Sequence, residues 1–212
     1  MKFHLPKIYP LTDTGLSALT HAEQVSALIE GGARFIQIRE KNASADEFYR
    51  SVAASKEIAD RYEAKIIVND RVDIAMAAGA HGVHLGQTDL PPVKTRKLLG
   101  EEAIIGISTH SIEQAVQALE IPVDYIAFGP VWPTRTKEDP DPVVGLELLG
   151  EVKRIAGQIP VVAIGGINQS NVAATLSAGA DSAAVISDLY RGPETIAARF
   201  RLLTETATVK HL

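Results

Sequence analysis

Two carboxylates follow two short apolar runs, at positions that would let them share a metal ion. Asp70 follows the run at 65–69, and Asp89 follows the run that begins at Gly82. Short β-branched runs are typical of buried parallel strands, and polar groups just past such strands often face a ligand. Carboxylates are ligands that Mg²⁺ prefers. Asp70 is also suited to capping the next helix, and Asp89 to a turn before Pro91-Pro92, so these alternatives stay open.

Basic, amide and hydroxyl side chains follow the other predicted strands. Each alone has an ordinary explanation, because strand ends must be soluble. Their convergence with two acids on one rim favours a phosphorylated ligand, whose remaining charge Lys and Arg would neutralise. These strand-end residues are Gln37, Arg39, Lys41, Asn69, His84, Gln87, Ser108, His110, Thr134, Arg135, Thr136, Lys137 and Ser187.

Three further features have two interpretations each. Gly165-Gly166 precedes a predicted helix, and its exposed backbone N–H groups favour a phosphate site, with a plain tight turn as the alternative. His84 is interpreted as a packed strand residue rather than a ligand. Trp132, in a long loop, is suited to a lid or to anchoring that loop. No His pair has helical spacing, which argues against a zinc hydrolase.

The composition is that of an ordinary globular domain. The 212 residues are 46% hydrophobic and 22% charged, with a net charge of −5 and acids and bases interspersed. We therefore expect no nucleic-acid partner, which would need a basic patch. The chain has no Cys, which excludes disulfides and thiolate metal sites. It lacks a signal-peptide pattern and an apolar run of membrane-spanning length, so we expect a cytoplasmic protein with no membrane partner.

Strand-type apolar runs alternate with helical patterns along the whole chain. The predicted strands lie at 8–13, 35–41, 66–69, 82–85, 104–108, 125–128, 161–164 and 182–186. The predicted helices lie at 22–30, 45–62, 72–78, 93–99, 111–119, 146–156, 171–178 and 193–204. This alternation predicts an α/β fold, a (β/α)8 TIM barrel with a single domain over 1–212 and a frayed tail at 205–212. A doubly wound open sheet is the alternative, weakened because no Gly-x-Gly-x-x-Gly fingerprint follows the first strand.

Motifs in a fixed order resemble those of the thiamine phosphate synthase family over nearly the whole chain. They are Gln37-Ile38-Arg39-Glu40-Lys41, Val68-Asn69-Asp70, Val83 to Asp89, Gly106-Ile107-Ser108, Gly129 to Lys137 and Ala163 to Ile167. The resemblance implies a (β/α)8 enzyme that uses Mg²⁺ to join 4-amino-2-methyl-5-pyrimidinylmethyl diphosphate to 4-methyl-5-(2-phosphoethyl)thiazole or its carboxylate form. Thiamine phosphate and diphosphate are the implied products. The implied mechanism is dissociative, with C–O cleavage before attack by the thiazole nitrogen.

The resemblance also implies a role for each matching residue. Asp70 and Asp89 would hold Mg²⁺ against the diphosphate. The implied catalytic residues are Lys137, Ser108 and Arg39. The implied pyrimidine diphosphate-binding residues are Gln37, Ile38, Arg39, Glu40, Lys41, Asn69, Ser108 and Lys137. The implied thiazole phosphate-binding residues are Thr134, Arg135, Thr136, Gly166, Ile186 and Ser187.

Two alternatives accompany this resemblance. A thiazole tautomerase of the same barrel family carries a His in place of Pro130 and loses parts of the diphosphate site. A barrel that only senses a phosphorylated thiazole would lose Asp70, Asp89 or Lys137, and this chain keeps all three. The segment 138–144, with three acids and two prolines, departs from the family pattern and bears on lid closure. The implied partners are small phosphorylated substrates and a second copy of the chain, in a homodimer.

Overall fold

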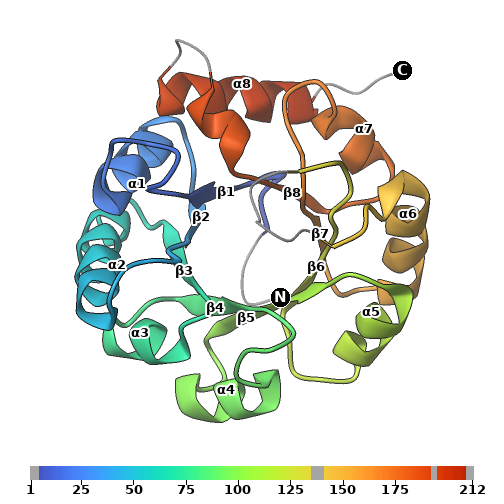
Figure 1. Cartoon of the computed structure of the whole chain (residues 1–212), viewed down its shortest axis with the longest axis horizontal. Helices are drawn as coiled ribbons and strands as arrows, with labels where there is room; N and C mark the ends of the chain where they lie inside the picture. The colour runs from blue at the N-terminus through green and yellow to red at the C-terminus, as the bar shows by residue number, and fades with distance from the viewer. Residues whose placement is uncertain (1–4, 135–140, 192–194, 209–212) are drawn as a thin grey trace.

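The chain forms a closed parallel barrel. The computed structural model describes residues 5–134, 141–191 and 195–208. Eight parallel strands pair in chain order, and β1 closes the sheet by pairing with β8. Figure 1 shows the helices as an outer ring around this barrel. The prediction of a single-domain (β/α)8 barrel is confirmed, and the open doubly wound sheet is excluded.

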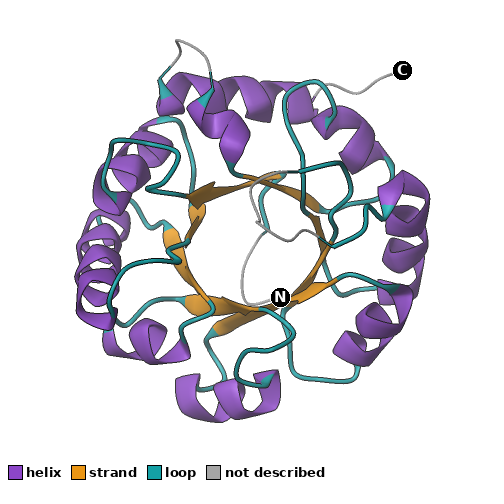
Figure 2. Ribbon diagram, in the orientation of Figure 1, coloured by secondary structure: helices purple, strands orange, loops and turns teal. Residues whose placement is uncertain are grey.

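Strands and helices alternate throughout, as Figure 2 shows by colour. The strands are β1 (Ile8–Thr12), β2 (Phe35–Ile38), β3 (Lys65–Asn69), β4 (Gly82–Leu85), β5 (Ile104–Thr109), β6 (Tyr125–Phe128), β7 (Val161–Ala163) and β8 (Ser182–Val185). The helices are α1 (His21–Glu30), α2 (Ala45–Asp60), α3 (Val72–Ala77), α4 (Pro92–Leu99), α5 (Ile112–Leu119), α6 (Gly145–Ala156), α7 (Val172–Ser177) and α8 (Ile196–Thr208), with a 3₁₀ helix η1 (Ser187–Tyr190) before α8. Within the described residues, no helix has the length and apolarity needed to cross a membrane.

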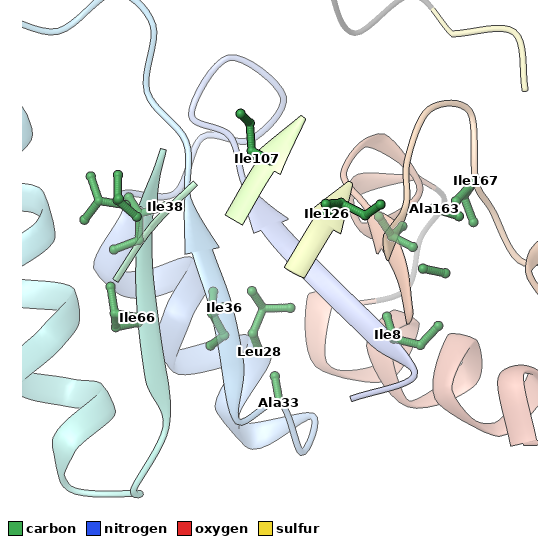
Figure 3. Close-up of a cluster of buried hydrophobic side chains, with 14 of the residues drawn as sticks. Ile8, Leu28, Ala33, Ile36, Ile38, Ile66, Ile107, Ile126, Ala163 and Ile167 are labelled. Carbon is green, nitrogen blue, oxygen red and sulfur yellow. The ribbon is translucent and has the colours of Figure 1, made fainter. Parts of the chain in front are cut away.

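The strands are buried on both faces because their side chains alternate between two cores. Ile8, Ile36 and Ile66 belong to the larger core, between the barrel and its helices (Figure 3). A second cluster, which includes Tyr9 and Tyr125, fills the barrel interior. Polar residues on this inner face near the strand ends therefore face the space above the second cluster.

Capping side chains fix where the helices begin, and so fix the loops that precede them. Thr20 and Glu23 form a capping box at the start of α1, and Ser44 and Glu47 form another at α2. Ser111 caps α5, as predicted, by accepting a hydrogen bond from the N–H of Gln114. Such caps satisfy N–H groups that the helix cannot pair itself.

The largest differences from the sequence-based prediction lie in β2, in α8 and at η1, while the other boundaries agree to within two residues. β2 ends at Ile38 rather than at residue 41, because Glu40 accepts hydrogen bonds from the two following N–H groups and turns the chain. α8 continues to Thr208, so the prediction of a frayed tail is wrong for 205–208, where Ala207 packs against the core. Residues 209–212 lie outside the described part. The short helix η1 was not predicted.

Candidate active site

A cavity of about 540 Å³ lies at the C-terminal ends of the strands. This volume is in the range of small-molecule binding sites. Residues at the ends of all eight strands contribute to its wall. The lining residues include Leu11, Gln37, Arg39, Lys41, Asn69, Asp70, His84, Gln87, Asp89, Ser108, His110, Pro130, Thr134, Asp141, Gly165, Gly166, Ile186 and Ser187.

The cavity brings together most of the sequence-predicted site residues. Those that line it are Gln37, Arg39, Lys41, Asn69, Asp70, Asp89, Ser108, Thr134, Gly166, Ile186 and Ser187. Ile38 and Glu40 are not part of the lining. Arg135, Thr136 and Lys137 lie outside the described residues, so their roles stay predictions.

Ile38 faces the helices rather than the cavity. It is fully buried in the larger core, where Figure 3 labels it. Because side chains alternate along an extended chain, Gln37 and Arg39 face the cavity and the residue between them faces away. The prediction that Ile38 binds the pyrimidine diphosphate therefore stays a prediction for its backbone, since its side chain is buried away from the cavity.

Glu40 also faces away from the cavity, and its carboxylate holds the loop after β2. Oε1 accepts hydrogen bonds from the N–H groups of Lys41 (2.7 Å) and Asn42 (2.8 Å). Oε2 accepts from the Thr14 hydroxyl (2.9 Å) and lies 3.3 Å from Nε2 of His21. The carboxylate of Glu40 thus positions the loop that carries Arg39 and Lys41, and its predicted contact with the ligand stays a prediction.

These contacts keep Glu40 ionised. Burial alone would raise its pKa, but hydrogen bonds from Asn42, Thr14, Lys41 and His21 outweigh it and lower the pKa to about 2. Burial lowers the pKa of His21, so its ring is neutral near pH 7. Nε2–H of His21 then donates to Glu40, and Nδ1 accepts from the Thr12 hydroxyl, 2.7 Å away.

We predict that Glu40→Gln lowers the free energy of unfolding at neutral pH by about 1.5–3 kcal/mol, since it removes hydrogen bonds to a charged group. A lowered carboxyl pKa stabilises the fold above the unfolded-state value, 4.5, and this contribution is lost as the pH falls towards about 2. Denaturant titrations should therefore show the difference between variant and wild type shrinking across that window. Glu57→Gln, which removes only an exposed pair with Arg61, is the control. A difference that does not change with pH would contradict this assignment.

Asp70 and Asp89 face each other across one corner of the cavity. Asp70 has a φ of +62°, a conformation that is uncommon outside glycine and concentrated at functional sites. Arg71 occupies the N-cap of α3, which has no side-chain cap hydrogen bond, so the interpretation of Asp70 as a helix cap is wrong. Asp89 accepts from the N–H of Gly86 (2.6 Å) in a turn and also lines the cavity. The corner thus presents two carboxylates from adjacent strands.

The charges in this corner are only partly balanced. Burial raises the pKa of Asp89, the Gly86 hydrogen bond opposes the rise, and the nearby charge of Asp70 adds to it. Nζ of Lys41 lies 2.5 Å from Oδ2 of Asp70. Within the described part of the chain, no three His, Cys, Asp or Glu side chains gather as a metal-binding group. Two carboxylates with a free face suit a cation that completes its shell with ligand and water oxygens.

Arg39 is held in place at the mouth by an acid that sequence reasoning missed. Nη1 of Arg39 lies 2.7 Å from Oδ2 of Asp13, and both side chains are mostly buried. The feature that identified Asp70 and Asp89 in the sequence, an acid at the end of a strand, also applies to Asp13, which directly follows β1. The ion pair fixes the guanidinium beside the cavity.

The wall formed by β4 and β5 is built from buried hydrogen-bonding groups. Nε2 of His84 lies 2.9 Å from Oγ of Ser108, and Nδ1 lies 3.0 Å from the Tyr125 hydroxyl. Burial lowers the pKa of His84 to about 4, so the ring is neutral. His84 is 5% exposed, which agrees with its interpretation as a packed residue, yet it also lines the cavity.

Among the described residues, two buried polar atoms on β2 and β3 have no hydrogen-bond partner. They are the Oε1 atom of Gln37 and the Nδ2 atom of Asn69. Both side chains line the cavity. Buried polar atoms are nearly always paired in folded proteins, so these two mark where a polar ligand is expected to bind.

The far end of the cavity is formed by glycines and a serine. Gly166 has a φ of +65°, and a Cβ there would lie 2.4 Å from the carbonyl oxygen of Pro133. A side chain at this position is therefore excluded by the turn itself as well as by any ligand. Trp132 donates from Nε1 to Oγ1 of Thr175 (3.0 Å), which supports the interpretation that it anchors the loop. Ser187 completes this end.

Comparisons with known proteins agree with the fold. Residues 8–189 match the family model described as thiamine monophosphate synthase. A thiamine-phosphate synthase of Methanocella arvoryzae is 44% identical over 192 residues, 90% of each chain, and one of Persephonella marina is 48% identical over 167 residues, 79% of each chain. The thiamine phosphate pyrophosphorylase structure from Pyrococcus furiosus superposes with a TM-score of 0.84 at 37% identity, covering 95% of each chain.

The chain belongs to the thiamine-phosphate synthase family. The family match begins at Ile8, in β1, and ends at Leu189, in η1, so it includes every strand that lines the cavity. The site described above is therefore part of the family domain, and its residues can be assigned roles in a transferase.

Proposed function

We propose that this protein is a thiamine-phosphate synthase. It transfers the 4-amino-2-methyl-5-pyrimidinylmethyl group from its diphosphate to the nitrogen of 4-methyl-5-(2-phosphoethyl)thiazole or its carboxylate form, releasing diphosphate. The observation that carries the proposal is that one cavity has two different anion-binding ends. Arg39, Lys41 and the two acids form one end, and Gly166 with Ser187 forms the other.

The acidic and basic end fits a diphosphate with Mg²⁺. Asp70 and Asp89 would hold the ion, because their oxygens are the ligands it prefers and the unbalanced charge at Asp89 favours a cation. When bound, Mg²⁺ would neutralise charge on the leaving diphosphate. Arg39 would donate to the same diphosphate, in a geometry fixed by Asp13. Lys41 is placed to move between Asp70 and a phosphate oxygen.

The mechanism needs a stabilised leaving group and two aligned rings. In the dissociative route, the C–O bond breaks to give a pyrimidinylmethyl cation and diphosphate, and the thiazole nitrogen then donates its electron pair to the cation. The chain contributes cationic groups where negative charge grows, and walls that hold both rings in line. Lys137 is proposed as a further cation at the leaving group, and Thr134, Arg135 and Thr136 as contacts to the thiazole phosphate.

Pro130 favours the synthase over the thiazole tautomerase. It lines the cavity at the position where the tautomerase relatives carry a His, and it offers no group that takes up a proton. The test is to incubate the protein with Mg²⁺ and each substrate alone or both together. The synthase forms thiamine phosphate, together with diphosphate, only when both substrates are present. Deuterium exchange into the thiazole carboxylate phosphate, with no diphosphate released, would instead identify a tautomerase.

We further propose a homodimer, as the resemblance implies, and a cytoplasmic location, as expected from the sequence. Sedimentation of the purified chain would test the dimer, and a monomer over a broad concentration range would exclude it. Fractionation of the source cells would test the location.

A further inference from the structure

A chain of hydrogen bonds inside the barrel joins two residues of the cavity wall. It runs from Gln37 through Tyr9, Tyr125 and His84 to Ser108. The successive distances are 3.0 Å (Gln37 Nε2 to Tyr9 hydroxyl), 3.1 Å (between the two hydroxyls), 3.0 Å (Tyr125 hydroxyl to His84 Nδ1) and 2.9 Å (His84 Nε2 to Ser108 Oγ). Tyr9 and Tyr125 are at most 1% exposed and are not among the residues that line the cavity.

With the amide nitrogen of Gln37 facing the Tyr9 hydroxyl, the protons in this chain run in one direction. The amide nitrogen of Gln37 can only donate, so the Tyr9 hydroxyl accepts from it and gives its own proton to Tyr125. Tyr125 then donates to Nδ1 of His84, which leaves the ring proton on Nε2. Burial raises the pKa of both tyrosines, so each keeps its proton.

The two ends of the chain consequently present opposite polarity to the cavity. Because Nε2 of Gln37 is used by Tyr9, its Oε1 atom is left as an acceptor, and this atom has no partner. Because Oγ of Ser108 accepts from His84, its own proton is left to donate into the cavity. A neutral amide and a hydroxyl could each serve either way, and the buried chain removes that freedom.

We infer that Tyr9, Tyr125 and His84 are positioning residues that set the polarity of the base-binding wall, an acceptor at Gln37 and a donor at Ser108. An aromatic base that carries an amino group and ring nitrogens matches this wall, because it offers a donor to Gln37 and an acceptor to Ser108. Its oxo analogue, which offers a carbonyl beside a ring N–H, has the reverse pattern. The inference rests on the proposed function, which makes an aminopyrimidine diphosphate the substrate. It adds that the acceptor at Gln37 and the donor at Ser108 select the amino form over the oxo form.

The packing around Tyr125 supports a dedicated arrangement. Its ring stacks on His84, with centroids 5.5 Å apart and planes at 21°. It also occupies the space beside Gly106, where a Cβ would lie 2.1 Å from Cζ of the tyrosine. The glycine in the Gly106-Ile107-Ser108 motif is thus needed to let this ring reach His84.

The first test measures binding of the aminopyrimidine diphosphate and of its 4-oxo analogue by calorimetry, with Mg²⁺ and without thiazole. Both ligands carry the same diphosphate, so the ratio of their dissociation constants reports on the base alone. We expect the wild type to prefer the amino form by at least about 10²-fold, because the oxo form leaves buried groups unpaired. Tyr9→Phe frees the Gln37 amide to turn, and the preference should fall to about 10-fold or less.

The second test reads the tautomer of His84 by ¹H–¹⁵N NMR of the ligand-free protein. We expect the proton on Nε2 in the wild type and in Tyr9→Phe, which keeps the donor from Tyr125. Tyr125→Phe removes that donor, so the proton of His84 should no longer favour Nε2 over Nδ1. Ser55→Ala, which removes a buried hydroxyl bonded only within α2, is the control and should change neither measurement.

The possible outcomes separate this inference from the proposed function. A proton on Nδ1 of His84 in the wild type would overturn the polarity. An unchanged amino preference in folded Tyr9→Phe and Tyr125→Phe would overturn the positioning role. If neither pyrimidine diphosphate binds the wild type, the proposed function fails and the selectivity with it, whereas the NMR measurement still decides the polarity.

Discussion

Arg39→Ala is expected to lower kcat by about 10²–10³-fold, the usual effect of removing one preorganised electrostatic contact to a developing charge. Asp13 holds the guanidinium beside the cavity, with Nη1 2.7 Å from its Oδ2 atom. Charge on the diphosphate grows as the C–O bond breaks, so the contact strengthens in the transition state. KM for the thiazole phosphate should change little, because Gly166 and Ser187 lie at the other end of the cavity.

Rapid-quench measurement of pyrimidine diphosphate ionisation checks this expectation. Arg39→Lys should recover activity only in part, because an ammonium lacks the planar donor pair. Arg50→Ala, which breaks an exposed pair within α2, is the matched control and should behave as the wild type. Ionisation at the wild-type rate in Arg39→Ala would exclude a leaving-group role.

Asp89→Ala is expected to weaken Mg²⁺ binding by more than about 100-fold. Removing a residue that only supports a metal ligand typically weakens metal binding by about 10–100-fold, and Asp89 is proposed to be a ligand itself. Activity at a fixed low Mg²⁺ concentration should fall in parallel and return in part at high Mg²⁺. The same substitution removes a charge whose ionisation is opposed by burial and by Asp70. The metal-free variant should therefore be no less stable than the metal-free wild type.

Two titrations test this prediction. Mg²⁺-dependent activity gives the apparent metal affinity, and thermal unfolding with and without Mg²⁺ gives the linked stabilisation. Asp73→Ala, an exposed acid of α3 paired with Arg71, is the control for loss of one negative charge nearby. Equal Mg²⁺ dependence in Asp89→Ala and in the wild type would remove Asp89 from the metal site.

The fold could be predicted because its units repeat. A buried strand, a helix and a short turn recur along the chain, and such alternation leaves few arrangements other than a parallel barrel. The errors lie where local hydrogen bonds override the pattern. Glu40 ends β2 early by binding the next two N–H groups. η1 was missed because Ser187–Tyr190 is too short to show a periodicity.

The part of the site that could be predicted follows from a single rule about the ends of parallel strands. Residues at or just past the ends of parallel strands share one rim, and Asp70, Asp89 and Ser108 do line the cavity there. The same rule applied to a whole motif was too broad, because alternation along the chain sends Ile38 and Glu40 away from the cavity. Tyr9 and Tyr125 looked like ordinary core aromatics, and only the folded arrangement reveals that their hydroxyls connect two parts of the wall.

The most direct test of the proposed function is a single-turnover experiment with enzyme in excess over the pyrimidine diphosphate, in the presence of Mg²⁺ and thiazole phosphate. The account predicts that thiamine phosphate and diphosphate form in equal amounts and at the same rate, and that no thiamine phosphate forms when the thiazole is left out. Diphosphate release without thiamine phosphate, in the presence of both substrates, would contradict it.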